Sequence, residues 1–120
     1  MKYKFPFEKL EVWKDAMNLV KNVYELTRKM PEEEKFGLTN QTRRSAVSVP
    51  ANIAEGSSRL SGKSQKNFYQ IAYSSLMELY SHLLLAEDLE MIAIPDELIG
   101  EISLVSSKLN RLYNSTRLKV

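Results

Sequence analysis

The chain has 120 residues, 43% of them hydrophobic and 27% charged, with a net charge of +2. This balance excludes a disordered or membrane-spanning chain and predicts one globular domain, 1–120, with a single core. The absence of cysteine excludes disulfides and thiolate metal ligands, and no apolar run approaches the roughly 20 residues that cross a bilayer, so we expect a cytoplasmic protein with no membrane contact.

The first predicted helix covers residues 7–28. Its apolar residues alternate spacings of three and four, as they do on one face of an α-helix. They are Leu10, Trp13, Met17, Val20, Tyr24 and Thr27. Pro31 opens a polar loop that ends at Gly37, so we expect the helix to stop near Pro31.

The second predicted helix runs from a cap at Thr39 or Asn40 to about Leu60. One arc is predicted to face the core, and it holds Ala46, Val49, Pro50, Ile53 and Leu60. A separate arc is polar, and it holds Gln41, Arg44, Ser48, Asn52, Glu55 and Arg59. The residues between the arcs are small, which predicts a close approach to a neighbouring helix, and a proline inside a helix predicts a kink.

Two further helices are predicted, over residues 63–91 and from Pro95 or Asp96 to Tyr113. Ser61 or Ser64 can cap the first of them. Short connections make sequential helices antiparallel. The sequence therefore predicts an all-α fold, an antiparallel up-down-up-down four-helix bundle.

The predicted helix 63–91 carries a wide apolar face. Its arc approaches about 200°, against the roughly 100° that a helix with one exposed face needs. The candidate oligomer contacts on it are Tyr69, Tyr73, Tyr80 and Leu84. Tyrosine is enriched at interfaces because its ring buries while its hydroxyl finds a partner. Two alternatives stay open, namely coverage by neighbours within the bundle and stacking of the tyrosines on unpaired bases.

The polar arc of the second helix has two interpretations. In the structural one, Glu55 pairs with Arg44 or Arg59 while Asn52 bonds a neighbouring backbone group. In the functional one, the arginines bind phosphates, because guanidinium forks match phosphate geometry. The candidate nucleic-acid contacts, around the junction of the second and third helices, are Arg43, Arg44, Arg59, Lys63 and Lys66.

The sequence offers little for catalysis or metal binding. His82 is the only histidine, and no second nitrogen ligand or Glu-x-x-His spacing surrounds it. The serines have no histidine near them in sequence, and there is no glycine-rich phosphate loop. We therefore expect no enzymatic activity, no metal and no cofactor.

Three segments resemble the four helix bundle protein family, whose members are products of intervening sequences in bacterial large-subunit ribosomal RNA genes. The segments are FEKLEVWKDAMNLVKNVYELT, EKFGLTNQTRRSAVSVPANIAEGSSR and FYQIAYSSLMELYSHLLLAEDL. The resemblance runs from about Phe7 to beyond Met91. Its structural signature includes Pro50, Asn52, Glu55 and Gly56. The stretch 74–76 departs from the glycine-serine-leucine that relatives often carry there.

This resemblance implies a compact bundle that assembles as a homopentamer. It also implies a relation to the accessory subunit of diversity-generating retroelements, in which a basic pentamer engages nucleic acid and a reverse transcriptase. Two functions are thus expected. The first is a non-enzymatic homo-oligomer that associates with RNA or DNA through a pooled basic surface. The alternative is a protein-interaction scaffold or accessory subunit, for example of a reverse transcriptase.

Overall fold

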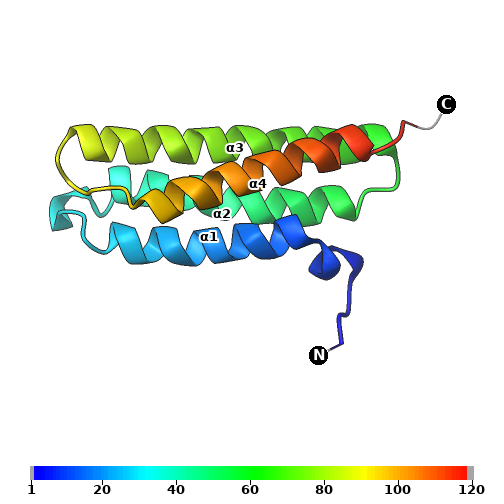
Figure 1. The fold of residues 1–120 in the computed structure, drawn as a ribbon, viewed down its shortest axis with the longest axis horizontal. Coiled ribbons are helices and arrows are strands. Elements are labelled where there is room, and N and C mark those ends of the chain that lie inside the picture. Colours follow the sequence, from blue (N-terminus) through cyan, green and yellow to red (C-terminus); the bar gives the residue numbers. More distant parts are fainter. Residues whose placement is uncertain (1, 119–120) are drawn as a thin grey trace.

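The computed structural model describes residues 2–118, and four long α-helices make up most of this part of the chain (Figure 1). They are α1 Glu11–Thr27, α2 Leu38–Ser57, α3 Gly62–Asp88 and α4 Asp96–Ser115. Two short 3-10 helices precede α1 and α2, and they are η1 Pro6–Lys9 and η2 Glu32–Glu34. None of the helices within residues 2–118 combines the length and the apolar character needed to cross a membrane.

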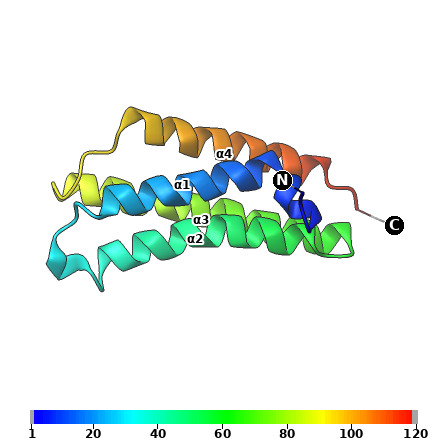
Figure 2. The ribbon, with the colours of Figure 1, turned by 90° about the horizontal axis from the view of Figure 1, so that it is seen from below.

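The four helices form an antiparallel bundle with up-down-up-down topology, as predicted (Figures 1 and 2). Each helix packs against its neighbours in sequence, and α4 returns to pack against α1. The connection α2–α3 and both described chain ends therefore lie at one end of the bundle. The connections α1–α2 and α3–α4 lie at the other end, along a molecule 50 Å in its longest dimension.

The core runs along the middle of the bundle and is built from the predicted apolar stripes. Its largest fully buried aliphatic side chains are Leu19, Val23, Val49, Ile53, Leu76, Leu79, Leu83, Val105 and Leu109. Burying one such side chain contributes about 1.5–3 kcal/mol. The prediction that Leu60 belongs to the core is wrong, because α2 ends at Ser57 and leaves Leu60 in the turn with 97% of its surface exposed.

The two central helices begin with different caps. Ser61 caps α3 as predicted, since its hydroxyl accepts from the Ser64 amide at 3.1 Å. The predicted caps of α2 at Thr39 and Asn40 are wrong, because that helix already begins at Leu38. The Glu34 carboxylate, placed by η2, accepts from the Leu38 amide at 3.0 Å instead. A carboxylate at a helix N-terminus satisfies a free amide and is favoured by the helix dipole.

Helices α2 and α3 approach closely along faces of small residues. The Ser48 and Ser75 hydroxyls lie 2.8 Å apart across the interface. The Asn52 amide donates to the Ser48 carbonyl at 2.8 Å, which confirms the structural interpretation of Asn52. Pro50 is buried in the same helix, which continues through it to Ser57; the kink expected there stays a prediction.

Gly56 marks the closest approach of α2 to α3. A Cβ atom at this position would lie 2.6 Å from Cε1 of Tyr69 and 3.1 Å from the Gln65 carbonyl oxygen. The first distance is far shorter than a van der Waals contact between carbon atoms. Only glycine therefore lets the ring of Tyr69 lie flat against α2 while the two backbones keep their spacing.

Polar contacts join α4 to α1. The Lys108 ammonium donates to the Asp15 carboxylate at 2.6 Å and to the Glu11 carboxylate at 3.2 Å. These bonds raise the pKa of Lys108 above its ordinary value. One turn and a half away, the Asn22 amide donates to the Glu101 carboxylate at 2.8 Å. The contacts set the register of α4 against α1.

Replacing Gly56 by alanine should destabilise the fold. An alanine gains about 1 kcal/mol in helix propensity, but the collision with the Tyr69 ring costs more, as overpacked cores lose about 1–3 kcal/mol. Gly100→Ala is the matched control, because Gly100 lies in α4 with nothing within 4 Å of its added Cβ. We expect Gly56→Ala to lower the free energy of unfolding in urea and Gly100→Ala to raise it by about 0.5–1 kcal/mol. Equal stabilisation by both would contradict the packing described for Gly56.

Candidate nucleic-acid interface

The charged side chains are segregated between the two ends of the bundle. The end with the α2–α3 turn and the chain ends carries Lys4, Lys9, Arg59, Lys63, Lys66, Arg111 and Arg117. We call this set the basic end. The opposite end carries Glu32, Glu33, Glu34, Glu87, Asp88, Glu90, Asp96 and Glu97. Each end also holds a minority of the opposite sign, such as Glu8 and Lys35, but the excess at each end is clear.

The predicted cations at the α2–α3 turn come together, and aromatic rings hold two of them. The Arg59 guanidinium lies 4.5 Å from the centroid of the Phe68 ring, and the Lys66 ammonium lies 4.6 Å from that of Tyr113. Lys63 is exposed on the first turn of α3. Arg59 also lies 3.7 Å from Glu55, an exposed pair that confirms the structural interpretation of Glu55 and contributes little energy.

The structure does not place Arg43 and Arg44 with this cluster. Both lie in the first half of α2, and Arg43 is about 20 Å of helix away from Ser57, where α2 ends. The predicted single cluster at the junction of α2 and α3 is therefore wrong in extent. It reduces to Arg59, Lys63 and Lys66.

Arg43 makes contacts with α1. Its Nε donates to the Thr27 hydroxyl at 2.9 Å, and its guanidinium lies 4.5 Å from the centroid of the Tyr24 ring. Thr27 is itself buried and donates to the Val23 carbonyl at 2.8 Å. A cation here also faces the C-terminus of α1, where the helix dipole is negative. Arg43 thus ties α2 to the end of α1, whereas Arg44 is exposed.

The candidate oligomer contacts on α3 differ in accessibility. Tyr69 is only 4% exposed and packs on Gly56, so it is covered inside its own chain and the prediction that it meets a partner is wrong. Burial also raises the pKa of its hydroxyl above the ordinary value. Tyr73 and Tyr80 are half-buried against the core, whereas Leu84 is 41% exposed. The surplus apolar surface is therefore narrower than the sequence predicts.

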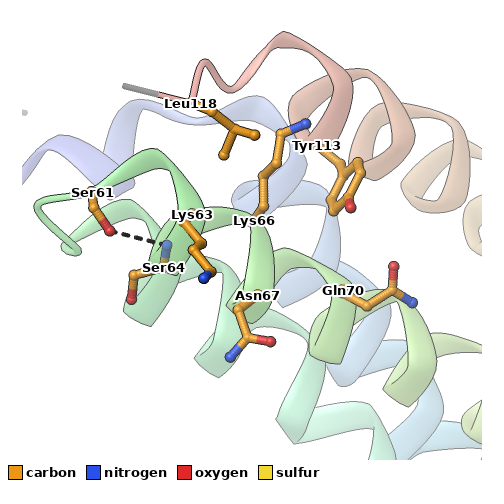
Figure 3. A pocket seen from close by; sticks show the side chains of 8 residues that line it. All are labelled: Ser61, Lys63, Ser64, Lys66, Asn67, Gln70, Tyr113 and Leu118. Carbon is orange, nitrogen blue, oxygen red and sulfur yellow. Dashed lines mark hydrogen bonds between the residues drawn. The ribbon is translucent and has the colours of Figure 1, made fainter. Parts of the chain in front are cut away.

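A groove of about 680 Å³ opens beside the cations, between the start of α3 and the end of α4 (Figure 3). Its lining residues are Ser61, Lys63, Ser64, Lys66, Asn67, Gln70, Tyr113 and Leu118. The C-terminal segment closes one side, because its backbone at Arg117 packs against Gly62, where any side chain would collide with it. The sequence gave no sign of this groove, since Tyr113 and Lys66 are far apart in the chain and meet only through the bundle topology.

His82 lies on α3 away from the groove. Its Nε2 atom is 3.7 Å from the Glu78 carboxylate, and it has no hydrogen-bond partner among the residues that the structure describes. Across residues 2–118, no group of three or more histidine, aspartate or glutamate side chains is arranged to hold a metal ion.

Residues 8–111 match the family described as 23S rRNA-intervening sequence protein. The chain belongs to this family. A comparison with curated proteins gives no match. The span that matches the family contains α1, α2, α3 and most of α4, and so it includes Arg59, Lys63 and Lys66. Tyr113, which completes the groove, lies just beyond that span.

Arg43 and Arg44 offer a matched pair for separating a structural arginine from an exposed one. We expect Arg43→Ala to lower the free energy of unfolding by about 1–2 kcal/mol, because it removes a charged hydrogen bond to buried Thr27. Arg44→Ala should change it by less than about 0.5 kcal/mol. Urea denaturation of both variants measures this difference, and equal stability of the two would show that the Arg43 contact contributes nothing.

Proposed function

We propose that this protein is a non-enzymatic homo-oligomer that associates with RNA or DNA through its basic end. The observation that supports this most is the segregation of charge along the bundle. Cations collect at the α2–α3 turn and the chain ends, while acidic side chains collect 50 Å away or less at the far end. Phosphates are attracted to the first end and repelled by the second, so a nucleic acid has one favoured approach.

Oligomer formation would strengthen this attraction. Cyclic symmetry repeats every subunit in the same orientation about one axis. If the helices run along that axis, all basic ends gather on one face of the ring. Five subunits, each with a net charge of +2, carry about +10 together, which is enough for salt-dependent binding to phosphates.

The outer side of α3 offers a surface for subunit contact. Tyr73, Met77, Tyr80 and Leu84 follow one another at spacings of four, three and four, which places them on one stripe of the helix. Met77 and Leu84 are 37% and 41% exposed, and the two tyrosines are half-buried. An exposed row of apolar and aromatic side chains is typical of an interface core.

No reaction forms part of the proposal. The single histidine, His82, lies beside Glu78 on α3, about 24 Å along the helix from Lys66. A general base or metal ligand would have to act near the bound phosphates, and the basic end presents lysines, arginines, serines and amides instead.

A protein scaffold or accessory subunit is the second candidate, and a different surface favours it. A groove of about 570 Å³ lies between η1 and the end of α2, and two exposed apolar side chains, Phe5 and Leu60, line it. Exposed apolar side chains around a groove favour contact with another protein. This alternative predicts no salt-dependent binding of nucleic acid.

Reversing the charge of the α2–α3 cluster should remove nucleic-acid binding. The variant with Arg59→Glu, Lys63→Glu and Lys66→Glu is expected to bind labelled RNA and duplex DNA about 100-fold more weakly at low salt, since each lost cation releases fewer counterions. Fluorescence anisotropy across a salt titration measures both the affinity and its slope against salt.

The matched control changes the net charge equally at a different place. It carries Lys21→Glu, Lys29→Glu and Lys35→Glu, three exposed lysines of α1 and the α1–α2 connection. We expect it to retain affinity within about tenfold of the unmodified protein. Equal losses in the two variants would show that total charge rather than the basic end governs binding, and absence of binding by the unmodified protein at low salt would refute the proposal.

The subunit contact is tested with two leucines. Leu84→Lys should convert the oligomer to a 13.8 kDa monomer in analytical ultracentrifugation, because a charge in an interface core must be desolvated. Leu60→Lys, an identical change at a more exposed leucine outside the α3 stripe, should leave the assembly intact. An unmodified protein that sediments as a monomer at high concentration would exclude the ring.

A further inference from the structure

We infer that the groove beside Tyr113 binds one unpaired nucleotide, and that the protein therefore prefers single-stranded nucleic acid to duplex. This inference rests on the proposed function and identifies the form of nucleic acid that the basic end takes. It follows from the kinds of side chain that meet in the groove, from their spacing and from the size of the space between them.

The groove has the dimensions of a small-ligand site. Its volume of about 680 Å³ falls within the range of roughly 300–1,000 Å³ usual for such sites. Lys63, Lys66, Asn67 and Gln70 follow one another at spacings of three, one and three on α3, so they span about 10 Å along one face. That length suits one nucleotide with its flanking phosphate.

Three kinds of group line the groove, and each matches a different part of a nucleotide (Figure 3). The ammonium groups of Lys63 and Lys66 match a phosphate. The amides of Asn67 and Gln70 are exposed on α3 and offer both donors and acceptors, which match the polar edge of a base. Tyr113, on the facing helix α4, offers an aromatic ring on which a base can stack.

The contact between Lys66 and Tyr113 shows how the site would change on binding. The ammonium now lies 4.6 Å from the ring centroid, a cation–π contact worth about 0.5–1 kcal/mol at an exposed site. A nucleotide supplies a phosphate for the ammonium and a base for the ring together. Both partners thereby exchange a weak contact for a stronger one.

A duplex cannot use this arrangement. In a double helix the faces of the bases are stacked on each other and their pairing edges are occupied, so it could meet the lysines only through its phosphates. Unpaired bases can be splayed out onto aromatic rings and amides. The tyrosine and the two amides should therefore add affinity only for single strands.

The experiment compares a labelled single-stranded oligouridine with a blunt RNA duplex, using the full chain in its native assembly. Tyr113→Ala should weaken binding of the single strand by about 5- to 100-fold and leave duplex binding within about twofold. Tyr113→Phe should retain the affinity, because the ring remains. Gln70→Glu, which places a negative charge in the groove without changing the ring, should also weaken single-strand binding.

The matched control is Tyr3→Ala. Tyr3 carries a similar lysine contact, with the Lys14 ammonium 4.8 Å from its ring centroid, but it does not line the groove. This variant should bind both oligonucleotides as the unmodified protein does. Each variant is first shown to keep the mass and helical content of the unmodified protein.

The outcomes separate this inference from the function on which it rests. If Tyr113→Ala binds both oligonucleotides normally while the triple charge reversal of Arg59, Lys63 and Lys66 abolishes binding, the nucleotide site is refuted and the proposed function stands. If the unmodified protein binds neither oligonucleotide at low salt, the proposed function and this inference both fail. Selective loss of single-strand binding in Tyr113→Ala supports the nucleotide site.

Discussion

The close approach of α2 to α3 is the contact on which the rest of the molecule depends. It requires Gly56 beneath the ring of Tyr69, and it is continued by the hydrogen bond between Ser48 and Ser75. Because the two backbones lie so near each other, the turn between the helices is short, and the cations on either side of it are neighbours. The same contact buries Tyr69 inside its own chain and so narrows the apolar surface that remains for a second subunit.

Antiparallel topology then turns a modest net charge into a polarised molecule. The chain carries acidic residues in the α1–α2 and α3–α4 connections and basic residues near the α2–α3 turn and the chain ends. An up-down-up-down bundle places the first two connections at one end and the other segments at the opposite end. Such separation would be lost in a topology with a crossover connection. The electrostatic field is therefore a property of the connectivity as well as of the composition.

The groove depends on the same topology, because the start of α3 and the end of α4 lie side by side only when the fourth helix returns along the third. Gly62 lets the C-terminal segment lie against the first turn of α3, and the Ser61 cap holds that turn in place. The family of 23S rRNA-intervening sequence proteins matches the bundle as far as residue 111. Tyr113 and Leu118 of the groove lie outside that match, so recognition of an unpaired nucleotide is a proposal about this chain rather than about the family.

The number, order and approximate limits of the helices could be predicted from the sequence, because a helical period and its breakers are local properties of the chain. The roles of Asn52 and Glu55 were also predictable, since their partners lie one turn away in the same helix. Contacts between helices decided the rest. Arg43 binds the end of α1, Tyr69 is covered by α2, Leu60 is left in a turn, and Lys66 meets Tyr113 across the bundle. No periodicity within one segment carries these outcomes, because each is set by the distance and rotation of one helix relative to another.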